Sequence, residues 1–225
     1  PTGETFSLAG RKRLIDLARA LDVPLIEDTA YSALRFEGEP VPCMQAIDVA
    51  ETGSIDNSHV VYAGTFSKTL TPGLRIGWIC ASDAIVRRVV LIKQASDLNC
   101  AAINQMVMYR LASGIYDEQV AKASAHYKSR RDAMLAALEA HMPPGVTWTK
   151  PEGGLFIWVT LPEGHDGARL LERAEKEANV AFVPGGAFFT DGSGRNTIRL
   201  AYSAANEERI AEGIARLGAL MTSKA

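Results

Sequence analysis

The stretch "YAGTFSKTLTPGLRIGW", Tyr62 to Trp78, decides the fold and raises the question of function. Apolar runs flank it, "HVVYAG" before and "LRIGWICA" after, and each predicts a buried strand. Between them Lys68 stands among hydroxyl side chains, and Arg75 follows a Pro-Gly turn. A lysine on a solvated face usually has acidic or mixed-charge neighbours, which this loop lacks. Taken alone, Lys68 is still more typical of a surface charge than of an amine with a chemical role.

The composition narrows the class of protein. With 225 residues, 47% of them apolar, the chain can build one large domain or two modest ones. A net charge of −2 with interspersed signs predicts neither a nucleic-acid partner nor a membrane surface. No apolar run approaches the length of a membrane span. The three cysteines are widely spaced and form no CxxC motif, which favours reduced thiols in a cytoplasmic protein and no metal site.

The first half of the chain alternates apolar strands with amphipathic helices. Ser7 is a candidate N-cap for the first helix, and "VPLIED", "HVVYAG" and "LRIGWICA" predict buried strands. Further helices are expected at about 83–96, 101–113 and 116–141. This alternation favours an α/β fold, a largely parallel sheet with flanking helices.

The pattern changes after Pro143-Pro144-Gly145. Here "VTWTKPEGGLFIWVTLP" and "TIRLAYS" predict strands, and a last helix is expected after a cap at Asn206. This half is expected to form a small α+β domain, with the boundary near residue 115 and domains 1–115 and 116–225. Five aromatic residues are expected to pack its core, with one or two facing a substrate: Phe156, Trp158, Phe182, Phe188 and Phe189.

Two reactive side chains follow neighbouring predicted strands. Asp28 ends "PLIED", and Lys68 comes a few residues after "VVYAG". Ligands of open α/β sheets collect beyond the carboxyl ends of the strands, so we expect both residues at one edge. Asp28 on its own could equally be a turn carboxylate, but the combination favours a site. A desolvated lysine amine can attack a carbonyl to form a Schiff base.

The residues around Lys68 suit a phosphate. Thr65 and Ser67 offer hydroxyls and Arg75 a planar guanidinium, all of which bind phosphate oxygens. A carboxylate such as Asp28 can keep a pyridine nitrogen protonated, and the phenol of Tyr31 can donate to a ring oxygen. Together these groups describe a site for pyridoxal 5′-phosphate.

Five ordered motifs carry a family resemblance: "DTAYSALRF", "GTFSKTLTPGLRIGW", "KPEGGLFIWVTLP", "AFVPGGAFF" and "NTIRLAYS". Together they resemble the fold-type I, pyridoxal-phosphate-dependent aminotransferases of class I/II, in particular the 2-aminoadipate, aromatic and branched-chain group. The likeness covers essentially the whole chain. It implies the fold-type I architecture, with an incomplete large cofactor-binding domain and a small C-terminal domain.

The resemblance also implies a role for each site residue. Lys68 forms the internal aldimine and moves a proton between Cα and C4′ during transamination of an amino acid and a 2-oxo acid. Asp28 lies on the pyridinium nitrogen, Tyr31 on the ring hydroxyl, and Arg199 of "IRLAYS" clamps the substrate α-carboxylate. The implied phosphate ligands are Thr65, where the family usually has serine, Ser67 and Arg75.

Two alternatives remain, a lyase or decarboxylase on the same scaffold and the effector-sensing domain of a winged-helix transcription regulator. The resemblance implies a homodimer. Because "PTG" at Pro1 resembles the end of the family's Asn-Pro-Thr-Gly turn, we expect the chain to be part of a longer protein. The missing part would complete the cofactor cradle, so this chain alone is expected to be inactive.

Overall fold

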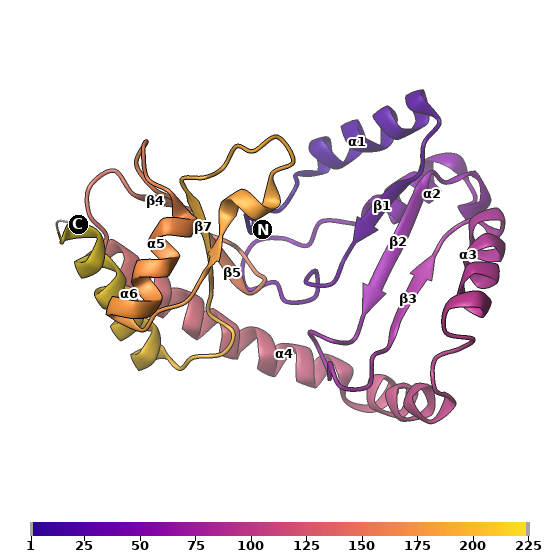
Figure 1. Cartoon of the computed structure of the whole chain (residues 1–225). Helices are drawn as coiled ribbons and strands as arrows, with labels where there is room; N and C mark the ends of the chain where they lie inside the picture. Colours follow the sequence, from indigo (N-terminus) through magenta and orange to yellow (C-terminus); the bar gives the residue numbers. More distant parts are fainter. Residues whose placement is uncertain (1, 224–225) are drawn as a thin grey trace. The chain divides into compact units, whose positions relative to one another are not determined.

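The computed structural model describes residues 2–223 and divides into two compact units (Figure 1). One unit is Phe6–Ala123, called here the lysine unit. The other, called here the arginine unit, combines the residues up to Thr5 with those from Ser124 onward. The division lies inside a helix, whereas the sequence placed a domain boundary near residue 115.

The lysine unit contains a three-stranded sheet flanked by helices. Its strands are β1 (Leu25–Asp28), β2 (Val60–Thr65) and β3 (Gly77–Cys80), in the order β1-β2-β3. The helices of this unit are α1 (Leu8–Leu21), α2 (Met44–Thr52), the short η1 (Ile55–Asn57), α3 (Asp83–Ser96) and the first part of α4 (Ala102–His141). Ser7 caps α1 as predicted, because its side chain accepts the amide of Gly10.

The sheet of the lysine unit is mixed. Strands β1 and β2 are parallel, with Leu25 opposite Val60, whereas β2 and β3 are antiparallel, with Thr65 opposite Gly77. The α/β class is as predicted, but in the described residues only one of the two strand pairs is parallel. The reason is that α2 lies between β1 and β2, whereas no helix crosses over between β2 and β3.

Helices α1 and α2 pack against one face of this sheet. Ile15 of α1, Met44 and Ile47 of α2 and Val60 of β2 form a buried cluster. On β1, however, Ile26 is 70% exposed. The expectation of a buried strand in "VPLIED" is therefore wrong for one of its faces, because successive side chains of a strand point to opposite sides. The same expectation for "LRIGWICA" is wrong as well, because all four residues of β3 are exposed.

A single helix, α4 (Ala102–His141), replaces the two helices predicted at 101–113 and 116–141. Gly114 lies between the two predicted segments. A Cβ built at this glycine meets nothing within 4 Å, so the helix continues past an open position. Glycine in a helix interior costs only about 1 kcal/mol relative to alanine, which the rest of a long helix offsets.

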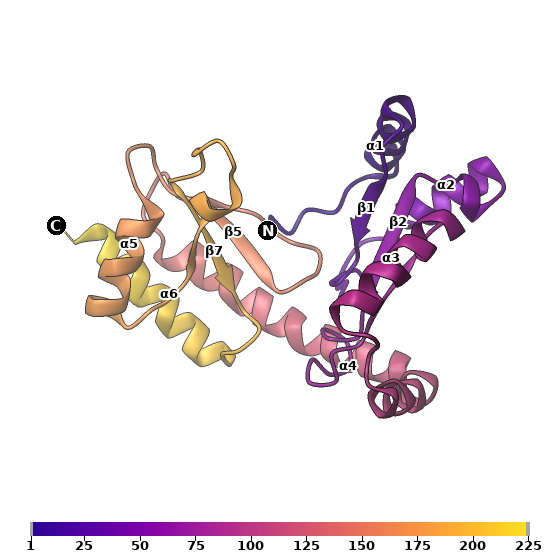
Figure 2. The same ribbon diagram turned by 45° about the vertical axis from the view of Figure 1, so that its right-hand side comes forward.

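The arginine unit has an antiparallel sheet in the order β4-β5-β7-β6 (Figure 2). The strands are β4 (Thr147–Trp148), β5 (Phe156–Thr160), β6 (Val183–Pro184) and β7 (Thr197–Ala201). The helical segments are α5 (Gly167–Arg173), its π-helical continuation η2 (Ala174–Ala178), the 3-10 turn η3 (Gly185–Phe188) and α6 (Glu207–Thr222). Asn206 caps α6 as predicted, and Ile210, Ile214 and Leu217 are buried.

The aromatic residues of this unit divide into two groups. Trp158 and Phe182 are buried, as expected for the core. Phe188 and Phe189 are 39% and 41% exposed and lie outside the core, which agrees with the expectation that one or two of the five aromatic residues are not packed inside. Their position on η3 and directly after it, rather than on a strand, explains the exposure.

Within residues 2–223, no helix combines the length and the apolar character that crossing a membrane requires. In the same range, no three His, Cys, Asp or Glu side chains group as metal ligands would.

Candidate active site

Glu27, on the buried face of strand β1, holds the strand in place. The Glu27 carboxylate accepts the amides of Met44 (2.9 Å) and Gln45 (3.2 Å) at the start of α2 and pairs with Arg11 at 3.2 Å. A carboxylate at a helix N-terminus satisfies amides that have no partner within the helix. Glu27 therefore anchors β1 to α2, and its neighbour Asp28 points to the other side of the sheet.

The loop after β1 is tied to the end of β2. The amide and the hydroxyl of Thr29 both donate to the carbonyl of Ala63, at 2.9 and 2.8 Å. Asp28 accepts the amide of Ala30 through Oδ1 at 3.0 Å, so it is also a turn carboxylate. Oδ1 thus holds the turn, and Asp28 is exposed at the sheet edge where the sequence placed it.

Lys68 lies close to the loop that carries Asp28. Its Nζ lies over the ring of Tyr31, 5.6 Å from the ring centroid. A cation within about 6 Å of an aromatic centroid is attracted to the face of the ring. The lysine side chain is half-buried. The structure thus brings together Lys68 and Tyr31 across the ends of two parallel strands.

The hydroxyls of Thr65 and Ser67 also lie together. The Thr65 hydroxyl is 3.0 Å from the Ser67 hydroxyl and 3.1 Å from the carbonyl of Ile76, and the Ser67 amide donates to Thr65 at 3.1 Å. The amide of Phe66 donates to the same Ile76 carbonyl at 3.2 Å. These bonds hold the loop before Lys68 against the segment that contains Arg75.

Arg75 has a left-handed backbone, with φ at +55°. This region costs a residue with a Cβ about 1–2 kcal/mol, and such strain is concentrated at functional sites. The Pro72-Gly73 turn enforces it, since Arg75 donates to the Pro72 carbonyl from both its amide and its side chain. The guanidinium is therefore held against the Pro72 carbonyl at 3.3 Å, although Arg75 is exposed.

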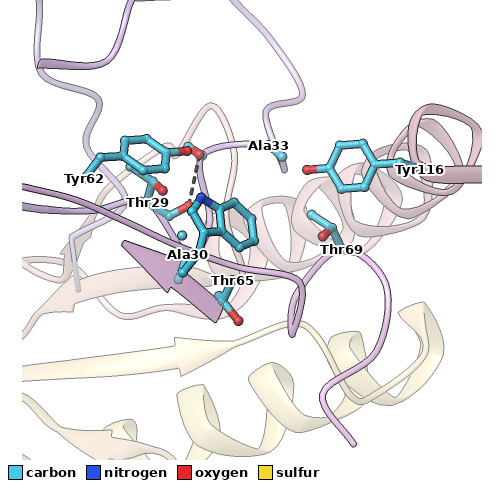
Figure 3. A pocket seen from close by; sticks show the side chains of 10 residues that line it. Thr29, Ala30, Ala33, Tyr62, Thr65, Thr69 and Tyr116 are labelled. Carbon is cyan, nitrogen blue, oxygen red and sulfur yellow. Dashed lines mark hydrogen bonds between the residues drawn. The ribbon is translucent and has the colours of Figure 1, made fainter. Parts of the chain in front are cut away.

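A pocket lies within the lysine unit and includes only one predicted site residue, Thr65 (Figure 3). Asp28, Tyr31 and Lys68 are not part of its lining. Its lining combines the loop after β1, the strands β2 and β3 and the helix α4: Thr29, Ala30, Ser32, Ala33, Tyr62, Gly64, Thr65, Thr69, Trp78 and Tyr116.

Thr69 is the main residue that the sequence interpretation missed. Only 4% of its side chain is exposed, and among the described residues its buried hydroxyl has no hydrogen-bond partner. A buried hydroxyl without a partner costs free energy, so it marks a place for a ligand or water. Its position directly after Lys68 in the hydroxyl-rich loop was the available signal.

Trp78 shapes the same pocket. A Cβ at Gly64 would lie 2.5 Å from the indole ring, so glycine is required where Trp78 crosses β2. The ring also packs on Phe66, with centroids 4.5 Å apart, and Phe66 makes an edge contact with Tyr116 at 6.0 Å. This aromatic packing of Phe66 stabilises the loop that carries Lys68.

Arg199 belongs to the arginine unit, where it lies on the central strand β7 opposite Trp158. Its Cζ lies 4.1 Å from the centroid of the Phe156 ring and 4.9 Å from that of Phe188. Among the described residues, its buried Nε has no hydrogen-bond partner. A guanidinium with an unused donor matches the predicted role of binding a carboxylate.

Comparison with known proteins places the chain in a family. Residues 1–217 match the family described as "Aminotransferase class I and II". The chain belongs to this family. Aromatic-amino-acid aminotransferase 1 of Thermococcus litoralis is 46% identical over 96% of the chain and 50% of its own length. The chain thus spans about half the length of the curated relatives it matches.

The solved structures agree. The α-aminoadipate aminotransferase of Thermus thermophilus, solved with N-(5′-phosphopyridoxyl)-L-leucine, has a TM-score of 0.91 and 38% identity, covering 98% of this chain and 56% of that one. The predicted fold-type I architecture is therefore confirmed. An uncharacterized HTH-type transcriptional regulator of Bacillus subtilis, YisV, is 35% identical over 95% of this chain and 42% of its own length.

Proposed function

We propose that the complete protein is an aminotransferase that uses pyridoxal 5′-phosphate to exchange an amino group between an amino acid and a 2-oxo acid. The observation that carries the proposal is the meeting of Lys68 and Tyr31 beside Asp28, at the ends of two parallel strands. An amine, a phenol and a carboxylate are the groups that a pyridoxal ring requires from a protein.

The residues present fit this cofactor. Thr65 and Ser67 offer hydroxyls that already lie together, and Arg75 adds a fixed positive charge, which suits a phosphate. Oδ1 of Asp28 holds its turn, and the carboxylate would face the ring nitrogen. When bound, the cofactor supplies a carbonyl that takes up the amino group and a ring that accepts electrons.

The protein side chains then have distinct tasks. With the cofactor bound, Lys68 would hold it through its amine and would move the proton at the substrate Cα when that amine is free. Asp28 keeps a proton on the ring nitrogen, and Tyr31 donates to the ring hydroxyl. Arg199 orients the substrate by its α-carboxylate, which limits the geometries in which proton transfer can occur.

The proposal also concerns assembly and location. We propose a homodimer, as the family resemblance implies, working in the cytoplasm. The unpaired thiols of Cys43, Cys80 and Cys100 favour a reducing compartment. Sedimentation of the complete protein at several concentrations tests the dimer.

Turnover of the complete protein with a panel of amino acids and 2-oxo acids tests the proposed function. Lys68→Ala should lower the rate by about 10³-fold or more, because both the covalent link and the proton transfer are lost. Lys93→Ala is the matched control, since Lys93 pairs with Asp97 on the surface of α3. Equal rates for the two variants would contradict the proposal.

The similarity to a transcriptional regulator means that turnover is the measurement that distinguishes an enzyme from a sensor domain. A sensor domain with the same residues would bind the cofactor without exchanging amino groups. Cofactor binding with no turnover for any amino acid, in the complete protein, would therefore favour the regulator. Release of carbon dioxide, or of an unsaturated product, instead of amino-group exchange would favour a decarboxylase or lyase.

A further inference from the structure

The guanidinium of Arg199 is held between two aromatic rings that come from different elements. Phe156 is on β5, the neighbour of β7, and Phe188 ends η3. The centroid distances of 4.1 and 4.9 Å place the Cζ of Arg199 within cation–π range of both rings. Arg199 is thus stabilised by ring faces, while its buried Nε has no partner among the described residues.

Phe188 owes its place to close backbone packing of the loop that carries it. A Cβ at Gly185 would lie 1.9 Å from the hydroxyl of Thr197, so only glycine lets η3 approach β7 this closely. The ring of Phe188 then meets Trp158 edge-on, with centroids 5.5 Å apart at an interplanar angle of 77°. The ring is fixed on two sides although it is 39% exposed.

Phe189, the next residue, differs in one respect. Its ring contacts Trp158 at 6.3 Å and covers Gly194, where a Cβ would lie 2.2 Å from the ring. Its exposure, 41%, is close to that of Phe188. The rings over which the Arg199 guanidinium lies, however, are those of Phe156 and Phe188.

We propose that Phe188, together with Phe156, is a positioning residue that holds Arg199 ready to bind the substrate carboxylate. This inference rests on the proposed function. Arginine has many rotamers, and ordering such a side chain on binding weakens affinity. A guanidinium already fixed between ring faces loses less freedom when a carboxylate binds. The ring faces also displace water, which strengthens the pairing of the two charges.

The contacts of Phe156 and Phe188 with Arg199 act on substrate binding rather than on the chemical step. The carboxylate stays paired with Arg199 before, during and after proton transfer at Cα. An interaction that is equally strong in the bound substrate and in the transition state changes KM and leaves kcat almost unaltered. Phe188 is therefore expected to set KM for amino acids and affinity for simple carboxylates.

The test uses the complete protein with three substitutions, Phe188→Leu, Phe188→Tyr and Phe189→Leu. Leucine keeps apolar volume but removes the ring face, and tyrosine restores it. Phe188→Leu should raise KM for the amino acid about 3- to 10-fold with kcat changed less than about twofold. Phe188→Tyr should restore KM, and Phe189→Leu should leave both constants close to those of the unmodified protein.

A second readout does not require turnover. The dissociation constant of a simple carboxylate such as propionate for the cofactor-loaded protein, measured by calorimetry, should rise by the same factor in Phe188→Leu. The rate at which phenylglyoxal modifies Arg199, followed by peptide mass spectrometry, should rise as well, since the ring no longer covers the guanidinium.

The outcomes separate this inference from the proposed function. Suppose that Arg199→Gln removes carboxylate binding but Phe188→Leu leaves KM and the dissociation constant unchanged. In that case only the positioning role of Phe188 is wrong. Equal effects of Phe188→Leu and Phe189→Leu, or a fall of kcat without a rise of KM, would also overturn it. If Arg199→Gln itself has no effect on carboxylate binding, the assignment of the clamp fails first.

Discussion

The lysine unit and the arginine unit place functional side chains in opposite ways. In the lysine unit, Asp28 ends β1, Tyr31 and Lys68 lie on the loops that follow β1 and β2, and all three are exposed or half-buried. In the arginine unit, Arg199 lies in the middle of a central strand, between aromatic rings and above a packed core. The lysine unit exposes its reactive groups, whereas the arginine unit restricts the movement of the Arg199 guanidinium.

The difference follows from the two tasks. A group that exchanges covalent partners has to move between positions, which a loop permits. A group that only orients a substrate gains from rigidity, which a strand in a buried sheet supplies. Substitutions of the reactive groups in the lysine unit should therefore act mainly on activity, and core substitutions in the arginine unit mainly on stability.

The largest effect after loss of Lys68 is expected at Asp28. Asp28→Asn keeps an oxygen for the amide of Ala30 but removes the negative charge, so the ring nitrogen loses its partner. Turnover should fall about 10²- to 10³-fold, the usual cost of one electrostatic group, while the melting temperature barely changes. Asp22→Asn is the control, since Asp22 ends α1 in a left-handed conformation that asparagine tolerates.

Ile157 tests whether core residues of the arginine unit act mainly on stability. It lies on β5 with 0% of its side chain exposed. Ile157→Ala should lower the free energy of unfolding by about 2–5 kcal/mol, because it removes buried methylenes and leaves a cavity. Denaturant melts measure this cost. Val183→Ala, at a 36% exposed position of β6, should cost less than about 1 kcal/mol. Similar costs at the two sites would contradict the packing described here.

Asp48 is a buried charge in the lysine unit that takes no part in the site. Burial alone would raise its pKa, but hydrogen bonds from Ser58 (2.6 Å), Arg19 (2.9 Å) and the amide of His59 (2.8 Å) outweigh it and lower the pKa. Asp48→Asn should lower the free energy of unfolding at pH 7 by about 2–3 kcal/mol, since Arg19 loses its buried partner.

The pH dependence of Asp48 has a definite sign. A carboxyl whose pKa is lower in the folded state stabilises the protein above its unfolded pKa, and this contribution is lost as pH falls through the folded pKa. The difference between the unmodified protein and Asp48→Asn should therefore shrink below about pH 4. A difference that stays constant down to pH 2 would argue against a charged Asp48.

The smallest effect is expected at Tyr202, at the end of β7. Its hydroxyl donates to the carbonyls of Gly154 (2.8 Å) and Gly153 (3.3 Å), and burial raises its pKa. Tyr202→Phe should cost about 1 kcal/mol of stability. Because the folded pKa is raised, this contribution should be complete below about pH 10 and should vanish at higher pH. Tyr109→Phe, at an exposed position, should show neither effect.

Local signals in the sequence predicted most of the elements. Ser7 and Asn206 are caps with side-chain oxygens, and each accepts an amide three residues on, so their prediction needed no tertiary information. The continuous helix α4 was predicted as two segments with Gly114 between them, and the open surroundings of this glycine let the helix continue. The antiparallel pairing of β3 depends on the absence of a crossover helix, which the apolar pattern does not reveal.

The candidate site was predictable as a set of residues but not as an arrangement. Asp28, Tyr31 and Lys68 follow predicted strands, so the rule for strand ends brings them to one edge. The buried hydroxyl of Thr69 and the contact between Arg199 and Phe188 could not be predicted in this way. Both depend on the position of loops after folding, which single residues and their spacing do not encode.

Lys68 is the residue that we propose to bind the cofactor covalently. The complete protein would be incubated with pyridoxal 5′-phosphate, reduced with borohydride and digested, and the modified peptide identified by mass spectrometry, beside Lys68→Ala. We predict one modified residue, Lys68, and no specific modification in the variant. Scattered modification of surface lysines in both proteins would contradict the account.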